Sequence, residues 1–400
     1  MTEKNVSRRA FVSAGALGAL AGAALLAGCN QPAPSGAEGS GSAEGSATTE
    51  GSGSAAGTET FRMTDMRGRE VDVPKNVEKL VAIGCAQRFA CYLGAADRLI
   101  AVEESDQKDQ VGCTYRHVYH DILSGLQVTG DGGPGGMLIN EEALIAAQPQ
   151  MILADWMDVD TCNAMQERTG IPVVALDQPE TVFDEFYYEN MMVAGKALGV
   201  EDRAKEIVDY IKGVQKDISD RVGDAGKDIK AYAGGITYSG GHGLAGTEPE
   251  FPPFLACGVQ NIADGHGSDT PFDIDLEEVI AAQPDYIFVE CGNLELIKED
   301  LANYPDIFNA LTAVTEGRTY TLVSHRWYST NVEIALANCY QVASAMFPEQ
   351  MEGIDPTQKI DEITQFMLDS PACTFFDSHR QSEDLAAEGQ EYKQIDLLSL

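Results

Sequence analysis

Basic residues are scarce in this chain of 400 residues. Lys and Arg together number 27 against 63 Asp and Glu, which gives a formal net charge of −36. A surface this acidic repels phosphate backbones, so nucleic-acid binding is disfavoured. The length is sufficient for two domains and a large core.

The short motifs of several enzyme classes are absent. The sequence contains no GxSxG, HExxH or Walker loop, so it offers no recognisable nucleophile, metal-bound water or phosphate cradle. We therefore expect a binding protein and not an enzyme. No cofactor of its own is expected either.

Cysteines spaced as CxxC are also absent, which argues against a zinc or iron–sulfur site of that kind. An even number of cysteines remains when Cys29 is set aside. In an exported protein these could form disulfides, and their scatter is equally compatible with buried free thiols. They are Cys85, Cys91, Cys113, Cys162, Cys257, Cys291, Cys339 and Cys373.

The only long apolar run lies at the amino terminus. Paired arginines, Arg8 and Arg9, precede the apolar stretch Val12–Leu26, which is too short for the roughly 20 residues of a membrane-spanning helix. The stretch leads into Leu-Ala-Gly-Cys at Cys29, which resembles a bacterial lipobox. Residues 1–29 are therefore predicted to be a signal peptide with a twin-arginine signal, and an ordinary Sec signal is the alternative.

Residues 30–58 consist almost only of Gly, Ser, Ala, Glu, Thr and Pro. Such a composition cannot bury a core and predicts a flexible tether. We expect an exported protein that is lipid-anchored through Cys29 to the outer face of the cell membrane, since acylation of that thiol provides the anchor.

A helix–turn–strand unit occurs twice. Ile139–Asp155 reads INEEALIAAQPQMILAD, and Phe272–Gly292 reads FDIDLEEVIAAQPDYIFVECG. In each copy apolar residues at helical spacing precede a proline, which ends the helix, and a short β-rich run follows. The repeat distance is too long for a solenoid. It predicts an α/β fold with two similar lobes, each with a central, mostly parallel sheet.

Between the two units, Glu201–Val222 carries one apolar stripe and is expected to form a long rigid helix that joins the lobes. The ligand cleft is then expected between the lobes. We assign residues 59–199 to the N-terminal lobe, 200–225 to the connecting helix, 226–372 to the C-terminal lobe and 373–400 to a polar tail on the surface. Residues 103–136 are expected to be a loop, and a helix is expected over residues 327–346.

Several stretches in this order resemble one family. MTDMRGREVDVPKNVEKLVAIG, LGAADRLIAVEE and LTAVTEGRTYTL, together with the two repeat units and the lipobox, are similar to the substrate-binding proteins of ABC importers for iron–siderophore, haem and cobalamin. The resemblance covers roughly residues 60–370. It implies capture of a metal chelate and delivery to an ABC permease and its ATPase.

The resemblance also implies one permease-docking glutamate on each lobe. Aligning the repeats on Pro149 and Pro284 places Glu142 opposite Glu277. Two equivalent carboxylates could form charge-assisted bonds to two permease subunits related by a two-fold axis. Alternatively, each is simply an acid favoured in the first turn of a helix.

Ligands bind where loops follow the carboxyl ends of parallel strands. Aromatic side chains offer flat apolar contact to a chelate, and arginines pair with its carboxylates. Packing at the surface is the alternative for each candidate. The ligand-binding candidates are Arg88, Tyr115, Arg116, His117, His120, Trp156, Tyr238, His242, Glu290, Arg326, Trp327 and Tyr328.

A bare transition-metal ion is the alternative cargo. His117 and His120 could share one helical face, with His242 arriving from the other lobe. The chain has only six histidines, and their spacing does not specify a complete ligand set. A purely structural surface protein is a third class, which the two lobes with aromatic loops disfavour.

Overall fold

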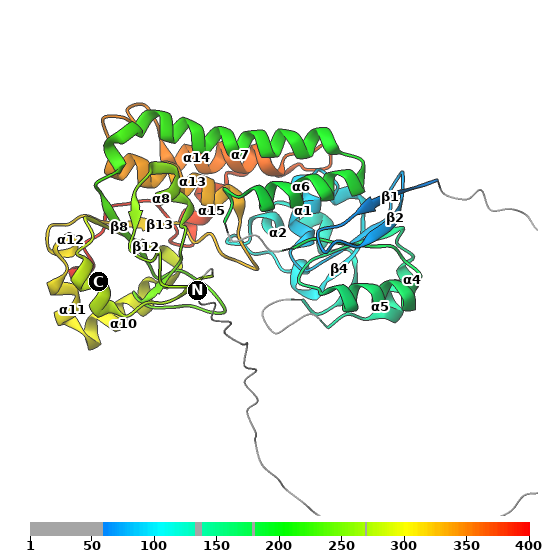
Figure 1. The fold of residues 1–400 in the computed structure, drawn as a ribbon, viewed down its shortest axis with the longest axis horizontal. Coiled ribbons are helices and arrows are strands. Elements are labelled where there is room, and N and C mark those ends of the chain that lie inside the picture. Colours follow the sequence, from blue (N-terminus) through cyan, green and yellow to red (C-terminus); the bar gives the residue numbers. More distant parts are fainter. Residues whose placement is uncertain (1–58, 133–137, 178–180, 269) are drawn as a thin grey trace, which may run out of the picture. The chain divides into compact units, whose positions relative to one another are not determined.

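Two parallel β-sheets form the centres of the two lobes (Figure 1). The computed structural model describes residues 59–132, 138–177, 181–268 and 270–400. The expected signal peptide, its Cys29 and the expected tether, residues 1–58 together, lie outside the described residues. None of the described helices is long and apolar enough to cross a membrane.

The first sheet has the strand order β5-β4-β3-β6-β7, with every neighbouring pair parallel. Its two central strands, LVAI and MILA, are buried along their whole length, as expected when helices cover both faces of a parallel sheet. The strands are β3 (Leu80–Ile83), β4 (Leu99–Glu103), β5 (Gln127–Gly130), β6 (Met151–Ala154) and β7 (Val173–Ala175). The helices of this lobe are α1 (Ala86–Tyr92), α2 (Thr114–Val118), α3 (His120–Leu123), α4 (Glu141–Ala147), α5 (Val159–Thr169) and α6 (Glu185–Leu198).

The second sheet has the order β10-β8-β12-β13 and is also parallel. Its strands are β8 (Lys230–Gly234), β10 (Gln260–Asn261), β12 (Tyr286–Glu290) and β13 (Thr319–Leu322). The helices are α8 (Pro252–Cys257), α9 (Leu276–Ala282), α10 (Leu294–Asn303), α11 (Pro305–Ala310), α12 (Thr312–Thr315), α13 (Val332–Met346), α14 (Pro356–Leu368) and α15 (Gln381–Ala387). The α/β class expected from the sequence is confirmed.

Two antiparallel ribbons lie outside these sheets. The first is a hairpin of β1 (Thr60–Thr64) and β2 (Glu70–Pro74) around Gly68, whose φ of 74° suits glycine at a tight turn. The second pairs β11 (Phe272–Asp273) with β9 (Gly246–Thr247).

The helix α7 (Glu201–Val222) has the bounds expected from its apolar stripe. Its buried residues are Ala204, Ile207, Val208, Ile211, Val214, Ile218 and Val222. It follows α6 of the N-terminal lobe and packs on α8 and α13 of the C-terminal lobe. Figure 1 shows it running alongside α13 and α14, where the ring of Tyr210 stacks on Phe366.

The repeated units adopt the same local structure. Asn140 and Asp275 cap α4 and α9, because each side chain accepts a hydrogen bond from an amide of the first turn. Each helix ends in a left-handed glutamine, Gln148 with φ of 55° and Gln283 with φ of 47°. A proline follows each, and the chain enters β6 or β12.

Three stretches differ from the sequence expectations. Residues 103–136 were expected to be a loop, but they contain α2, α3 and the edge strand β5. The expected helix over residues 327–346 begins only at Val332, because the preceding residues form a turn. The tail is also part of the fold, since Leu385 and Leu397 are buried and Gln394 forms an antiparallel bridge with Tyr320 of β13.

The eight cysteines of the described residues form no disulfide, and all but Cys373 are buried. Burial raises the pKa of Cys257 to about 12. Of the two possibilities left open by the sequence, the structure therefore shows free thiols.

Candidate functional site

A turn of the C-terminal lobe lies against the N-terminal lobe. The 326–330 turn (Arg326–Thr330) follows β13, and an antiparallel bridge joins its first and last residues. The amide of Trp327 donates to the carbonyl of Ser329 at 3.0 Å. Tyr328 and Ser329 have φ of 48° and 70°, so both adopt the left-handed conformation. Such strained backbone persists where the surroundings hold it in place.

Arg88 holds the backbone of this turn. Its guanidinium, on α1, donates to the carbonyl oxygens of Tyr328 at 2.8 Å and Trp327 at 2.7 Å. It also donates to Oδ1 of Asn331 at 3.1 Å. The thiol of Cys85 adds a contact to the Tyr328 carbonyl at 3.2 Å. A ligand-binding candidate predicted from sequence therefore joins the two lobes in this structure.

The Tyr328 side chain lies among residues of the N-terminal lobe. Its hydroxyl donates to Oε2 of Glu103 at 2.9 Å. Its ring meets that of Trp156 edge-on at 4.8 Å, and the Arg116 guanidinium lies 4.8 Å from the ring centroid. Trp156 itself has φ of 61°. Four candidates from both lobes thus meet at one place: Arg88, Arg116, Trp156 and Tyr328.

Glu103 ends β4 and is buried. Burial, together with the nearby charge of Asp106, raises its pKa to about 7. Hydrogen bonds from the Tyr328 hydroxyl and the Gly84 amide work in the opposite direction. The carboxyl of Glu103 therefore titrates in the neutral range and not in the acidic range usual for a glutamate. Sequence reasoning missed this residue, because an acid at a strand end is not distinguished by spacing.

Asp106 holds the side chains of Tyr115 and Arg116 in place. Its Oδ1 accepts from the Tyr115 hydroxyl at 2.6 Å and from Nε of Arg116 at 2.8 Å. Tyr115 is fully buried and Arg116 nearly so. Tyr115 therefore supports Arg116 and, through it, the contact between Arg116 and the Tyr328 ring. Tyr115 itself has no exposed surface.

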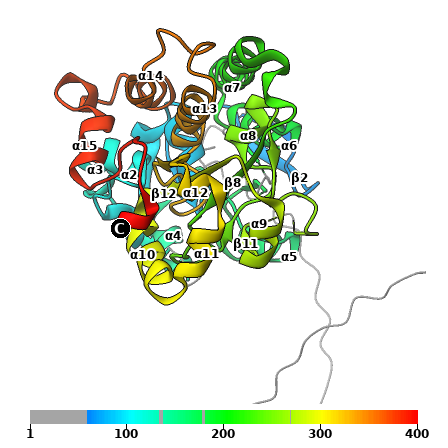
Figure 2. The same cartoon turned by 90° about the vertical axis from the view of Figure 1, so that its left-hand side faces the viewer.

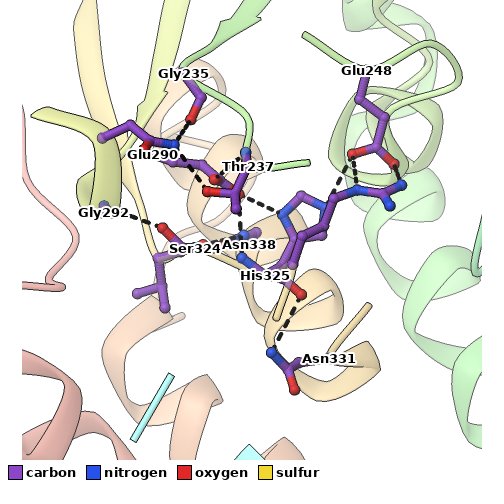
Figure 3. A network of polar contacts seen from close by, with 12 residues as sticks. Gly235, Thr237, Glu248, Glu290, Gly292, Ser324, His325, Asn331 and Asn338 are labelled. Atoms are coloured by element: carbon purple, nitrogen blue, oxygen red, sulfur yellow. Dashed lines mark hydrogen bonds and ion pairs between the residues drawn. The ribbon is translucent and has the colours of Figure 1, made fainter. Parts of the chain in front are cut away.

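A second polar cluster lies at the base of the turn (Figure 3). Arg326 donates from Nε and Nη2 to the two carboxylate oxygens of Glu248, at 3.0 and 2.7 Å. His325 lies between two carboxylates, with Nε2 3.1 Å from Glu248 and Nδ1 3.0 Å from Glu290. The Thr237 amide donates to the other oxygen of Glu290 at 2.9 Å. The cluster ties β12 and the β9 region to the residues after β13.

Oppositely charged groups shift one another's pKa values in this cluster. Burial lowers the pKa of His325, but the hydrogen bond to Glu248 and the close carboxylate of Glu290 outweigh this effect, and the pKa rises to about 9. Burial opposes ionisation of Glu248, yet Arg326 and His325 lower its pKa to about 2. His325 and Glu248 were not among the predicted residues, because neither their spacing nor their neighbours in sequence reveal that they meet.

The remaining candidates lie elsewhere. His117 contacts Asp109 at 2.7 Å and Asp384 at 3.3 Å. His242 contacts Asp273 at 2.9 Å and stacks on Tyr238 at 3.7 Å. His120 is half-buried on α3.

The structure does not bring these histidines into one metal site. Within the described ranges, no group of three His, Cys, Asp or Glu side chains is arranged to hold a metal ion. His117 and His242 have other partners in this structure, so the three histidines named for a bare ion are not assembled around one point.

A small cavity lies between the lobes beside the 326–330 turn. Its volume is about 30 Å³, enough for about one water molecule. The N-terminal lobe contributes Arg88, Thr181 and Tyr187 to its lining, and the C-terminal lobe contributes Glu248, Ser329 and Thr330. The Thr181 and Tyr187 hydroxyls are buried in the structure without a hydrogen-bond partner.

Glu142 and Glu277 occupy equivalent, exposed positions in the first turns of α4 and α9. Figure 2 shows both helices at the edge away from α7 and α14. Their neighbours differ: Glu141 pairs with Arg168, and Glu278 lies 3.5 Å from His266. The structure thus preserves the repeat symmetry that the sequence alignment assigned to the two glutamates.

Comparisons with known proteins agree with this architecture. A Bacillus subtilis protein, the uncharacterized ABC transporter substrate-binding lipoprotein YvrC, is 25% identical over 177 residues, 43% of this chain and 51% of that protein. The match thus spans about half the length of this curated relative. Many solved structures share the fold, among them the two that follow.

The first is the Haemophilus influenzae periplasmic binding protein MolA bound to molybdate, with TM-score 0.60 and 19% identity over 77% of this chain and 98% of that one. The second is Helicobacter pylori CeuE with Ni(II) bound, with TM-score 0.56 and 17% identity over 81% and 99%. The periplasmic binding protein family matches residues 92–325, more than half of the chain. The chain belongs to the periplasmic binding protein family and is a binding protein, not an enzyme.

Proposed function

We propose that this chain is an extracytoplasmic, lipid-anchored substrate-binding protein that captures a metal chelate of the iron–siderophore, haem or cobalamin type. It delivers the chelate to an ABC permease driven by its ATPase. The names of the relatives support the transport class, and the lipobox at Cys29 supports the anchor. No cofactor of its own takes part.

The observation that carries the proposal is the meeting of arginines and aromatic rings from both lobes at the 326–330 turn. Arg88 and Arg116 come from one lobe and Trp327 from the other, and Trp156 and Trp327 are each 39% exposed. Guanidinium groups bind the carboxylates of a chelate, and rings cover its flat apolar faces.

Ligand binding requires the turn to move. Ligand sites usually measure about 300–1,000 Å³, whereas the cavity beside the turn measures about 30 Å³. Withdrawal of Tyr328 would uncover the Trp156 ring and free the guanidinium of Arg88 from two carbonyl oxygens. These donors would then be available to oxygen atoms of the ligand.

Intrinsic fluorescence tests the proposal. Only Trp156 and Trp327 contribute tryptophan emission, and residues 59–400 lie within one compact unit. We expect saturable quenching of this soluble form by one of three probes: a ferric siderophore, haem or cobalamin. The variants Trp156→Phe and Trp327→Phe separate the two signals. Absence of a saturable change with all three probes, while the protein is folded, would overturn the chelate proposal.

A further inference from the structure

The C-terminal strap, residues 369–396, contacts both lobes. It follows α14, passes the N-terminal lobe with α15, and then returns to the edge of the second sheet. Figure 2 shows α15 on the side of α2 and α3. The match to the periplasmic binding protein family ends at residue 325, before this segment, and so assigns it no role.

The first part of the strap binds the N-terminal lobe. The Ser370 hydroxyl lies 3.2 Å from that of Tyr119. Asp384 lies 3.3 Å from Nε2 of His117, whose ring meets Phe375 edge-on at 5.1 Å. These contacts explain where His117 lies: it anchors the strap and does not face the turn.

The last part of the strap extends the second sheet at β13. The amide of Thr321 donates to the carbonyl of Lys393 at 2.9 Å, and the amide of Ile395 donates to the carbonyl of Thr319 at 2.9 Å. The Thr321 hydroxyl donates to the carbonyl of Glu391 at 2.6 Å. These bonds make the segment an added edge of the sheet, since backbone pairs with backbone.

Two buried glutamines of the strap bond to residues on either side of the 326–330 turn: one to Val111 in the N-terminal lobe, the other to Ser324 before the turn. Gln381 donates from Nε2 to the carbonyl of Val111 at 3.0 Å. The residue after Val111 is Gly112, whose carbonyl accepts a hydrogen bond from the Asn331 side chain at 2.9 Å. Gly112 also lies against the indole of Trp327, so closely that a Cβ atom on it would be 2.4 Å from Nε1. The turn thus packs against the N-terminal lobe at Val111 and Gly112, and we call these two residues its seat.

Gln390 supports the other side. Its Oε1 accepts from the Ser324 amide at 2.9 Å, directly before His325. The Ser324 hydroxyl in turn accepts from the Gly292 amide at 3.1 Å (Figure 3). The base of the turn is therefore bound to the strap through Gln390, and its seat is bound through Gln381.

We propose that the strap positions the candidate site, with Gln381 and Gln390 as its positioning residues. It ties the seat and the base of the 326–330 turn to one short segment, so the spacing between the lobes is maintained there. Only the tip of the turn, Trp327–Ser329, then needs to move when ligand gains access. The proposed role of the strap depends on the proposed function in one respect only, which is the identity of the ligand.

Hydrogen exchange of the full chain, without ligand, tests the strap directly. The informative amides are that of Trp327, which donates to Ser329 within the turn, and that of Asn331, which donates to His325 across the base of the turn. In Gln381→Ala and Gln390→Ala we expect their exchange to rise about tenfold, because local opening is no longer resisted. Exchange in α7 should stay unchanged. Glu388→Ala, on the exposed surface of the same segment, is the matched control.

A second pair of measurements separates positioning from general stability. Gln390→Glu keeps an acceptor for the Ser324 amide and should restore slow exchange. Unchanged exchange at Trp327 and Asn331 in both alanine variants would overturn the inference, and so would an equal rise in α7. Should an alanine variant not fold, an engineered protease site between Glu388 and Gly389 allows the same comparison after cleavage. The exchange experiment uses no ligand. Its outcome therefore does not depend on whether the fluorescence titration detects binding.

Discussion

The hydroxyl of Tyr328 lies 2.9 Å from the carboxylate of Glu103 and joins the C-terminal lobe to the N-terminal lobe. One partner is a buried acid whose pKa is raised to about 7. The other belongs to a turn whose backbone is held by Arg88. The contact between the lobes is therefore sensitive to protonation near neutral pH.

Replacing Glu103 by Gln should change how stability depends on pH. The folded pKa of about 7 lies above the unfolded value of 4.5, so the folded state binds its proton more tightly and stability falls as pH rises between these values. We expect this group to cost about 2–3 kcal/mol of unfolding free energy between pH 4.5 and 8. Urea denaturation at several pH values should show that Glu103→Gln lacks this loss. The control Glu104→Gln, at an exposed position, should behave as wild type, and equal slopes in all three proteins would contradict the prediction.

His325 should affect the free energy of unfolding at a more alkaline pH than Glu103 does. Its folded pKa of about 9 exceeds the unfolded 6.5, so its contribution is complete below pH 6.5 and is lost as pH rises through 9. His325→Gln leaves Glu248 and Glu290 with less compensation, and we expect a loss of about 3 kcal/mol at pH 6. Thermal unfolding from pH 6 to 9 should show that the difference from wild type shrinks as pH rises. The control His242→Gln, at a partly exposed site, should lower the stability far less. A difference between His325→Gln and wild type that does not change with pH would show that the charge of His325 is not the cause.

The two left-handed glutamines should respond oppositely to glycine. Glycine removes the left-handed penalty of about 1 kcal/mol, less the entropy it adds to the unfolded chain. Gln148 is exposed, so Gln148→Gly should leave stability unchanged or raise it by about 0.5 kcal/mol.

The side chain of Gln283 donates to the carbonyls of Ile280 at 2.8 Å and Ala310 at 2.9 Å. It also accepts from Thr312. Gln283→Gly should therefore destabilise by about 1–3 kcal/mol. Chemical denaturation of both variants checks the contrast, and equal effects would show that these side-chain bonds contribute little.

Charge reversal at the equivalent glutamates should separate binding from transport. We expect Glu142→Arg and Glu277→Arg to leave ligand affinity unchanged, because both lie on exposed first turns away from the 326–330 turn. Uptake should fall, since a carboxylate would be replaced by a charge that permease arginines repel. The control Glu352→Arg makes the same change at another exposed position. Wild-type uptake by the double variant would rule out docking through this pair.

Replacing Cys29 by Ala should release the protein from membranes. The thiol is the expected site of acylation, and acyl chains supply the apolar area that anchors the protein. Fractionation of cells should move the variant from the membrane to the soluble exported fraction. Its continued quantitative recovery with membranes would require another anchor.

Local patterns were sufficient for much of the fold. The repeated IAAQP units, with their apolar helical spacing and prolines, predicted both helix–strand pairs, and the stripe of Glu201–Val222 predicted α7 with its observed bounds. These features depend on neighbours in sequence. The stretch from Glu103 to Gly136 was misjudged because its short helices lack a long apolar period, and β5 is an edge strand with little burial.

The sequence by itself determined the acidic surface, the two-lobed α/β plan, the lipidation motif and the residue types of the candidate site. Only the tertiary structure decided what those residues contact. It paired Arg88 with backbone carbonyls, Tyr328 with Glu103, and His325 with two carboxylates. These partners are far apart in the chain or lie on different strands. Their encounter depends on how the sheets and the strap pack, because hydrogen bonds act over a few ångströms and sequence spacing does not specify such distances.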